Sequence, residues 1–395
     1  MTARSRIAFY INLDGLWTGG LLYYENLLRA LRAVVSPSEY ELLALLPKSD
    51  PAYTPFLQYM DEVHILPEPT LLERATNAVL PRMPQLVRDV LPSASALSRY
   101  ALRFRADVLF LKVDPGSHCS VPTLTWFPDF QYLHYPEMFS SAETAVISTA
   151  VRGIAKHSSR VILNSQAVRG DFARTIPEYL GKTRVVPFVS IIDESVYARD
   201  PYGVCKEYHL PEKFFYLPNQ IWKHKNHQTV LSALTLARRL HPDITVVSTG
   251  LFSDYRNPRF SSELLGKISR SGNREHFICL GLVPREHLYD LMRQSLALLQ
   301  PSLFEGWSTT VEEAKSLGKA VLLSDLPVHH EQNPPSAEYF PPLDSEVLAE
   351  KMVALYTARP PGPDRRLEQS ARQNLASRVR QFGESFLAVV AEIGR

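Results

Sequence analysis

A chain of 395 residues is longer than one ordinary hydrophobic core supports, so its length predicts two domains. The hydrophobic fraction of 45% is that of a globular protein, and a formal net charge of +2 gives no electrostatic reason to expect nucleic acid as a partner. The three cysteines lie far apart and in no metal-binding spacing, which predicts reduced thiols in a cytosolic protein.

The N-terminus places two arginines before a short apolar run over residues 7–13. This run is interrupted by Asn12 and is too short for the core of a signal peptide, so it predicts a buried strand. No stretch approaches the ~20 apolar residues that a membrane helix needs. We therefore expect a cytoplasmic protein, bound at most peripherally to the inner face of a membrane.

The first half of the chain alternates short apolar runs with helical patterns. After the first strand come a loop with Gly19 and Gly20 and a helix over residues 21–34. Further strands are predicted over residues 42–46, 63–66, 108–111, 123–126, 161–163 and 184–187. Continuous apolar runs separated by helices are typical of a parallel α/β sheet.

A second alternating series begins at residue 214, after the periodicity fades over residues 187–210. It predicts a helix near residues 227–240, and strands over residues 214–217, 244–248, 277–280, 296–299 and 320–323. The two series predict two Rossmann-like, doubly wound domains over residues 1–195 and 196–376. Residues 377–393 carry apolar side chains at helical spacing and predict a final amphipathic helix.

The turn over residues 301–314 is the strongest chemical signal. Its residue pattern predicts a strand, a tight loop and a helix. It contains two carboxylates, Glu305 and Glu313, with seven residues between them. Backbone N–H groups over residues 306–310 lie at the predicted helix start, where they suit an anion. A ligand with both phosphate and hydroxyl groups, such as a sugar nucleotide, fits this turn.

The pattern Thr309-x-x-Glu312 matches a capping box, which assigns Glu312 to the helix cap. Glu313 lies about 100° further round the helix and stays available for a ligand. The alternative is an ordinary capped helix with surface carboxylates.

Two further segments suit phosphate. Lys225 lies at a predicted helix start after a strand, which suits a diphosphate, although a Lys/His cluster of this kind is also common in solvated loops. Gly19 and Gly20 allow a phosphate to approach the backbone, but a plain turn explains them equally well, and no G-x-G-x-x-G fingerprint is present.

The turn over residues 300–322 resembles the E-x7-E region of retaining GT-B glycosyltransferases of family 4. The resemblance implies a GT-B fold of two Rossmann-like domains, in which residues 1–195 form the acceptor side and residues 196–376 bind the nucleotide sugar. The C-terminal helix over residues 377–395 would cross back to the first domain. It places Glu305 beside the donor sugar and Glu313 at the ribose hydroxyls. The backbone of Gly306, Trp307, Ser308 and Thr309 would contact the donor.

The segment over residues 219–227 resembles the G-R…K-G segment of that family. Lys225 takes the place of the lysine, while Gln220, beside Asn219, stands where the arginine would be. Lys223 is a candidate compensating cation. The glycine pair that faces the donor phosphates in the family corresponds to Gly19 and Gly20.

The segment over residues 126–137 resembles a family segment that begins His-Asp and ends Tyr-Pro-Glu. Asp129 agrees with it and is expected in the cleft, but Pro128 replaces the histidine. His134 is a candidate substitute on the acceptor side, and an ordinary surface or core histidine is the alternative.

The resemblance implies transfer of a hexose or deoxyhexose from a nucleoside-diphosphate sugar to a glycan or polyprenol-linked acceptor, with retention at the anomeric carbon. It favours GDP-mannose as donor and a role in surface polysaccharide or lipopolysaccharide assembly. The catalytic candidates are Glu305, Lys225 and Asp129. No Asp-x-Asp is present, so neither a metal nor another cofactor is expected.

Two other classes stay open: a sugar-nucleotide epimerase or phosphorylase on the same fold, and a non-catalytic protein that binds sugar nucleotides. A basic, amphipathic stretch over residues 78–105 also predicts either contact with anionic lipid, near a lipid-linked acceptor, or a solvated helix face.

Overall fold

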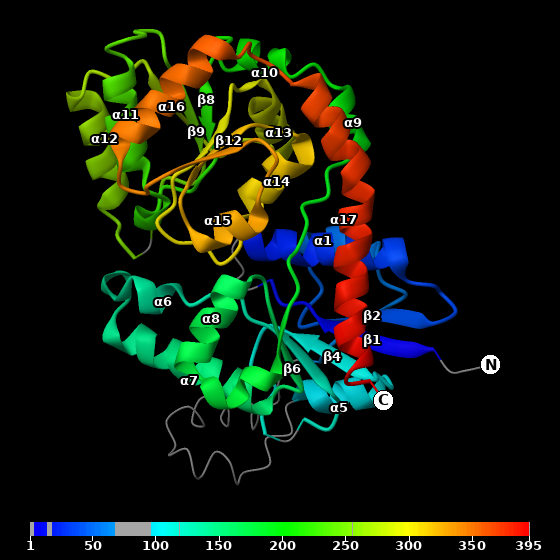
Figure 1. Cartoon of the computed structure of the whole chain (residues 1–395). Helices are drawn as coiled ribbons and strands as arrows, with labels where there is room; N and C mark the ends of the chain where they lie inside the picture. The colour runs from blue at the N-terminus through cyan, green and yellow to red at the C-terminus, as the bar shows by residue number, and fades with distance from the viewer. Residues whose placement is uncertain (1–3, 14–17, 68–95, 118, 255, 395) are drawn as a thin grey trace. The chain divides into compact units, whose positions relative to one another are not determined.

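The computed structural model describes residues 4–13, 18–67, 96–117, 119–254 and 256–394. The chain forms two compact units, shown in Figure 1. Unit 1 comprises residues 1–130, 140–188 and 379–395, and unit 2 comprises residues 131–139 and 189–378. The chain thus passes between the units at residue 188, before the expected boundary at residue 195, and the short segment 131–139 belongs with unit 2.

Unit 1 is built on a seven-stranded parallel sheet in the order β3-β2-β1-β4-β5-β6-β7. The strands are β1 (Ser5–Tyr10), β2 (Tyr40–Leu46), β3 (Glu62–Ile65), β4 (Val108–Leu111), β5 (Thr123–Trp126), β6 (Arg160–Leu163) and β7 (Thr183–Val185). Its helices include α1 (Thr18–Val34), α2 (Thr54–Leu57), α5 (Ala96–Arg103), α7 (Ser141–His157) and α8 (Gln166–Thr175). Every strand expected in the first half of the chain is present.

Helix α1 begins earlier than the sequence pattern indicates. Gly19 and Gly20 lie in its first turn, not in a loop before it. The prediction began the helix at the first large apolar residue, whereas the helical backbone already starts at Thr18.

An aromatic layer packs on one face of the sheet of unit 1. Tyr23 of α1 stacks on Trp126 of β5 with ring centroids 3.9 Å apart, and Phe386 packs on Phe110 at 5.4 Å. Phe386 belongs to the last helix, α17 (Arg365–Ala391). A Cβ at Gly383 would lie 2.7 Å from the Ala30 carbonyl oxygen, so this glycine permits the close approach of α17 to α1.

Unit 2 is built on a six-stranded parallel sheet in the order β10-β9-β8-β11-β12-β13. The strands are β8 (Phe215–Leu217), β9 (Val246–Thr249), β10 (Phe277–Gly281), β11 (Leu298–Gln300), β12 (Val321–Ser324) and β13 (Ala337–Phe340). The helices are α6 (Gln131–His134), α9 (Glu194–Ala198), α10 (Tyr202–Glu207), α11 (His227–Ala237), α12 (Phe260–Arg270), α13 (Arg285–Gln294), α14 (Thr309–Leu317), α15 (Pro327–Gln332) and α16 (Ser345–Ala358). Apolar runs in the sequence predict all of these strands except β13.

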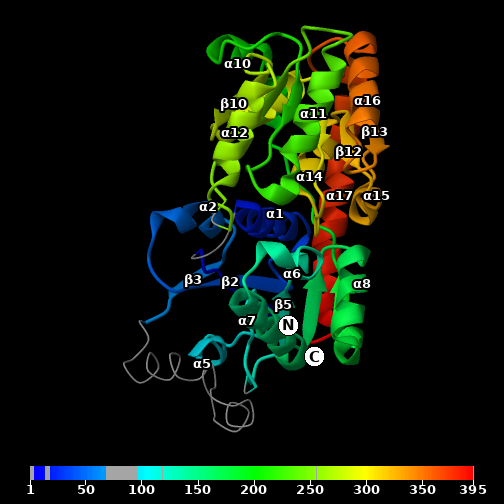
Figure 2. The ribbon, with the colours of Figure 1, turned by 90° about the vertical axis from the view of Figure 1, so that its left-hand side faces the viewer.

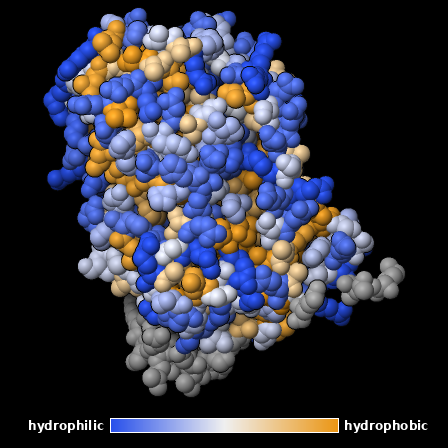
Figure 3. Space-filling view, in the orientation of Figure 1, coloured by the Kyte–Doolittle hydropathy of each residue, from blue (hydrophilic) through white to orange (hydrophobic). Residues whose placement is uncertain are grey.

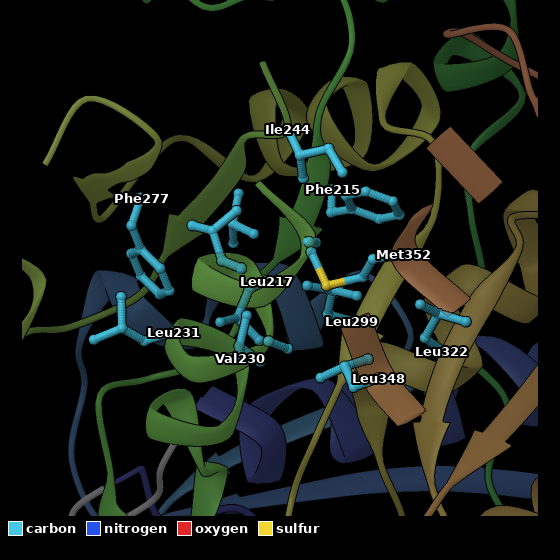
Figure 4. Close-up of a cluster of buried hydrophobic side chains, with 14 of the residues drawn as sticks. Phe215, Leu217, Val230, Leu231, Ile244, Phe277, Leu299, Leu322, Leu348 and Met352 are labelled. Carbon is cyan, nitrogen blue, oxygen red and sulfur yellow. The ribbon is translucent and has the colours of Figure 1, made fainter. Parts of the chain in front are cut away.

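Successive residues of β8 enter different core layers, because side chains alternate across a strand. Leu217 packs with α11, α12 and α16, whereas Tyr216 packs with α9, α10, α13 and α14. Figure 4 shows the first layer, in which Leu299 from the sheet lies near Val230 and Met352 from the helices. A sheet covered on both faces explains the continuous apolar runs of its strands.

The last helix contributes to both units. Residues 365–378 of α17 belong to unit 2, and the rest of the helix belongs to unit 1. Figures 1 and 2 show it as one continuous helix. The amphipathic pattern over residues 377–393 predicted a helix correctly, but the helix begins earlier, at Arg365.

None of the helices in the described ranges combines the length and apolarity that crossing a bilayer requires. On the face drawn in Figure 3, hydrophilic residues are interspersed with separate hydrophobic patches. The basic stretch over residues 78–105 lies outside the described residues up to residue 95, and its remainder includes helix α5.

Candidate donor site in unit 2

The candidate site forms where the strands of unit 2 end. All its strand pairs are parallel, so the loops after β8, β9, β11 and β13 emerge at one edge of the sheet, where open α/β sheets bind ligands. The loop after β8 carries Lys225 just before α11, and the loop after β11 carries Glu305 just before α14. The topology therefore brings together two candidates that are 80 residues apart in sequence.

Lys225 and Glu305 form a largely buried ion pair. The Lys225 ammonium donates a hydrogen bond of 2.6 Å to Glu305 Oε1, and the Gln300 amide donates another of 2.7 Å to the same oxygen. Asn219 in turn donates a 3.0 Å bond to the Gln300 carbonyl oxygen. Gln300, which the sequence analysis did not single out, is thus fixed between the two loops and orients Glu305.

The residues around Glu305 keep its carboxyl group ionised. Burial raises the pKa of this carboxyl, but the Lys225 ammonium and hydrogen bonds from Lys225 and Ser302 outweigh burial, so the net pKa lies below its usual value. Glu305 is therefore an ionised carboxylate at neutral pH, suited to accept hydrogen bonds from sugar hydroxyls.

The cap of α14 differs from the expected one. Ser308 is the N-cap residue, and its hydroxyl accepts the Val311 N–H at 3.4 Å, whereas Thr309 is already helical. Because the cap lies one residue earlier, Glu312 is not in the position of a capping box. Glu312 instead pairs with Arg378 of α17 and accepts a 3.2 Å hydrogen bond from the Gln332 amide.

Gln332 holds the N-cap residue of α14, Ser308, in place. Its amide carbonyl accepts the Ser308 N–H at 3.2 Å, and its amide NH₂ donates to the Ser308 carbonyl at 2.9 Å. Gln332 is fully buried at the end of α15. The expected donor-contacting turn, with Gly306, Trp307, Ser308 and Thr309, is therefore held in place by a side chain that the sequence analysis missed.

Glu313 is buried and points away from Glu312, as the helical spacing predicts. Burial raises its pKa to about 7, while the nearby Arg285 guanidinium and a hydrogen bond from Tyr289 act in the opposite direction. Arg285 in turn bonds to the Tyr289 hydroxyl at 2.8 Å. Arg285 and Tyr289 are four residues apart on α13 and therefore lie on the same side of that helix. This spacing is the sequence signal that could have indicated them as partners of Glu313.

The segment 131–139 packs on the site loops of unit 2. The Tyr135 hydroxyl donates a 3.0 Å hydrogen bond to the Leu303 carbonyl, and the His134 ring lies 4.8 Å from the Phe304 ring. Lys223, the candidate compensating cation, lies 3.6 Å from the Glu137 carboxylate. His134 is thus next to the residue that precedes Glu305.

Arg256 fastens this segment to the loop after β9. Its guanidinium pairs with Asp254, bonds to the Gln131 amide oxygen at 2.9 Å and lies over the rings of Phe139 and Trp222. The side chain is 6% exposed, so these contacts bury it almost completely.

The loop after β8 is also shaped by a glycine. Gly250 has φ +137°, and a Cβ there would lie 2.5 Å from the Asn219 carbonyl oxygen. The next residue, Gln220, is half-buried. The loop after β9 can therefore approach the Asn219–Gln220 backbone only with glycine at this position.

The other three candidates belong to unit 1. Gly19 and Gly20 lie in α1, and half-buried Asp129 follows β5. Asp129 acts on Lys112: burial lowers the pKa of that lysine to about 8, while the Asp129 carboxylate acts to raise it.

Comparisons with known proteins show which sequences and folds this chain resembles. Residues 207–374 match the family model described as Glycosyl transferases group 1. No curated protein matched the chain by sequence. Among solved structures, HepE from Anabaena in complex with UDP and glucose is similar, with a TM-score of 0.71 and 16% identity over 98% of this chain and 100% of that chain.

Two further structures cover almost the whole chain. Sucrose-phosphate synthase from Thermosynechococcus elongatus has a TM-score of 0.66 and 16% identity over 99% of this chain and 98% of that one. WaaG, a glycosyltransferase involved in lipopolysaccharide biosynthesis, has a TM-score of 0.57 and 13% identity over 98% and 99%. The fold is therefore GT-B, with two Rossmann-like α/β domains, and the residues that match the Glycosyl transferases group 1 model lie in unit 2.

Proposed function

We propose that this protein is a GT-B glycosyltransferase that uses a nucleoside-diphosphate sugar. The observation that carries the proposal is the buried Lys225–Glu305 pair, placed at the ligand-binding edge of a domain that matches the Glycosyl transferases group 1 model. The donor is a hexose or deoxyhexose nucleotide, with GDP-mannose preferred. The acceptor is a glycan or polyprenol-linked sugar in surface polysaccharide or lipopolysaccharide assembly at the inner face of the membrane.

Each residue then has a defined task. Lys225 and the first-turn N–H groups of α14 stabilise the charge that develops on the leaving diphosphate. Glu305 positions the donor sugar, and Glu313 accepts hydrogen bonds from the ribose hydroxyls. Lys223 supplies the second cation where Gln220 replaces an arginine.

The reaction exchanges one C–O bond for another. The bond from the anomeric carbon to the diphosphate breaks, a bond from that carbon to an acceptor hydroxyl forms, and the hydroxyl proton passes to a diphosphate oxygen. By family resemblance the anomeric configuration is retained and no metal takes part.

The test is release of nucleoside diphosphate from a panel of UDP- and GDP-sugars, with and without glycan acceptors. Lys225→Ala and Glu305→Gln are each expected to lower acceptor-dependent release by about 100-fold or more. Lys267→Ala, which removes an exposed lysine of α12, is the matched control. Full activity in either site variant would overturn the assignment of the site.

A non-catalytic sugar-nucleotide-binding protein is the second candidate, because Pro128 and Gln220 replace two polar residues of the family. That function predicts a donor nucleotide that stabilises the protein but releases no diphosphate with any acceptor.

A further inference from the structure

His329 of α15 is a fully buried histidine near the candidate donor turn. Its ring nitrogen Nδ1 lies 2.7 Å from the Ser324 carbonyl oxygen, which can only accept a hydrogen bond, so Nδ1 carries a proton and donates it. The other ring nitrogen, Nε2, is buried and has no hydrogen-bond partner among the described residues. A proton on Nε2 would be a buried charged donor without an acceptor, so the ring is a neutral imidazole in a single tautomer.

Buried hydrogen bonds link His329 to Glu305. Ser324, which accepts from His329 through its carbonyl, donates its own hydroxyl proton to the Ser302 carbonyl at 2.6 Å. The Ser302 hydroxyl in turn hydrogen-bonds to the Glu305 carboxylate. Gln300, which donates to Glu305 Oε1, also donates to the Ser302 hydroxyl at 3.1 Å. His329, Ser324, Ser302 and Gln300 are all fully buried, so a displacement of His329 reaches Glu305 through close-packed contacts.

The His329 ring also lies close enough to the Lys225–Glu305 ion pair to feel both charges. Burial is the main cause that lowers the pKa of His329, and the Lys225 ammonium lowers it further, while the Ser324 carbonyl and the Glu305 carboxylate act to raise it. The net direction is downward, so His329 is uncharged at neutral pH. An uncharged ring does not compete with Lys225 for the Glu305 carboxylate.

Helix α15 therefore supports the donor turn at two points. Gln332 bonds to the backbone of Ser308, the N-cap residue of α14. His329 lies three residues before Gln332, on the same side of the helix, and supports the Glu305 end of the turn through Ser324.

We propose that His329 is a positioning residue for glycosyl transfer: its Nδ1–H group fixes Ser324 and, through Ser302, holds the Glu305 carboxylate against the donor sugar. This inference rests on the proposed glycosyltransferase function, in which Glu305 positions that sugar. His329 itself neither touches the donor nor transfers a proton. A displacement of Glu305 by about 1 Å is enough to slow transfer by about 100-fold.

The test compares turnover with nucleotide binding. His329→Ala is expected to lower kcat for acceptor-dependent release of nucleoside diphosphate by about 10- to 100-fold, because Glu305 is no longer fixed. The Kd for free GDP or UDP should stay within about twofold, because the nucleotide alone has no sugar for Glu305 to hold, and this binding also shows that the variant folds.

His330→Ala is the matched control. His330 is the next residue of the same helix, but its side chain is 53% exposed and pairs with Asp325 at 2.6 Å. Its removal should change neither kcat nor the Kd for the nucleotide.

Two amide substitutions show which ring nitrogen matters. Asparagine places an amide N–H near the position of Nδ1, so His329→Asn should recover most of the activity that His329→Ala loses. Glutamine places its amide near the position of Nε2, so His329→Gln should not. Recovery by glutamine and not by asparagine would overturn the role of Nδ1.

The tautomer can be checked without any substrate. In ¹⁵N NMR of protein labelled at histidine, the His329 signal, identified by its loss in His329→Asn, should show a protonated Nδ1 and an unprotonated Nε2 at neutral pH. The opposite tautomer overturns the inference whatever the activity of the variants.

The outcomes also separate this inference from the proposed function. Wild-type protein that releases no diphosphate from any donor sugar would contradict the glycosyltransferase function itself. An active wild-type protein together with an equally active His329→Ala variant would overturn only the role of His329.

Discussion

At the residue scale, Glu313 makes the stability of the protein depend on pH. Its pKa is raised from 4.5 to about 7 in the folded protein, chiefly by burial. Between these values the folded state binds a proton that the unfolded state has released, so stability falls as pH rises. The full effect is on the order of 3 kcal/mol, from about 1.4 kcal/mol for each unit of pKa.

We expect Glu313→Gln to remove this contribution. The variant should gain stability relative to the wild-type protein as pH rises from 5 to 8, measured as the difference between their thermal unfolding midpoints. Other buried groups, such as Lys319, titrate in both proteins and cancel in this difference. Midpoint curves that run parallel over the whole pH range would contradict the buried, protonated state of Glu313.

At the element scale, α14 is held to α17 by a buried charge pair. Glu312 is 2% exposed, and Arg378→Met would remove the ion pair that its carboxylate forms. We expect a loss of about 3 kcal/mol in the free energy of unfolding. Replacing both residues by leucine should restore much of this loss, because no unpaired charge then stays buried.

Arg380→Met is the matched control for that substitution. Arg380 lies on the same helix, but its pair with Glu384 is exposed and 3.6 Å long, so its loss should cost less than about 0.5 kcal/mol in urea unfolding. Equal effects of the two arginine substitutions would show that the Glu312–Arg378 pair contributes no more than a surface pair.

The elements show what the sequence could predict. Central strands such as β4 and β11 were predicted because they are buried on both faces and therefore read as apolar runs. Strand β13, Ala337–Phe340, was missed because the polar Glu338 interrupts its apolar run. The cap of α14 was placed one residue late, because Ser308 and Thr309 are both good N-caps and only the backbone decides between them.

The candidate site was predictable to a similar degree. Glu305, Glu313 and Lys225 lie in motifs with recognisable spacing, and the parallel sheet brings Glu305 and Lys225 into contact. The residues that orient them, such as Gln300 and Gln332, carry no local pattern. Their role depends on contacts between segments distant in sequence, which the local pattern of a single sequence does not reveal.

At the scale of the whole molecule, α17 completes the core of unit 1. The Phe386 ring is fully buried against Phe9 and Phe110. Phe386→Ala is expected to destabilise unit 1 by about 3–5 kcal/mol. Hydrogen exchange of the wild-type protein and the variant should show faster exchange in β1 and β4, with little change in β8 and β11 of unit 2.

Faster exchange spread evenly over both units would contradict this division into two cores. Phe252, which is partly buried and packs in unit 2, provides the matched control: Phe252→Ala should alter exchange in β8 and not in β1.

The path of the chain through the two units has a consequence for its synthesis. Unit 1 takes its last helical segment from the end of α17, residues 379–391, which the ribosome adds after all of unit 2. Until Phe386 is added, the apolar surface of Phe9 and Phe110 that it covers stays uncovered, although all of unit 2 has already been made. Unit 1 therefore cannot complete its core until unit 2 has been made. A nascent chain arrested before residue 386 should expose to chaperones the apolar surface that Phe386 covers.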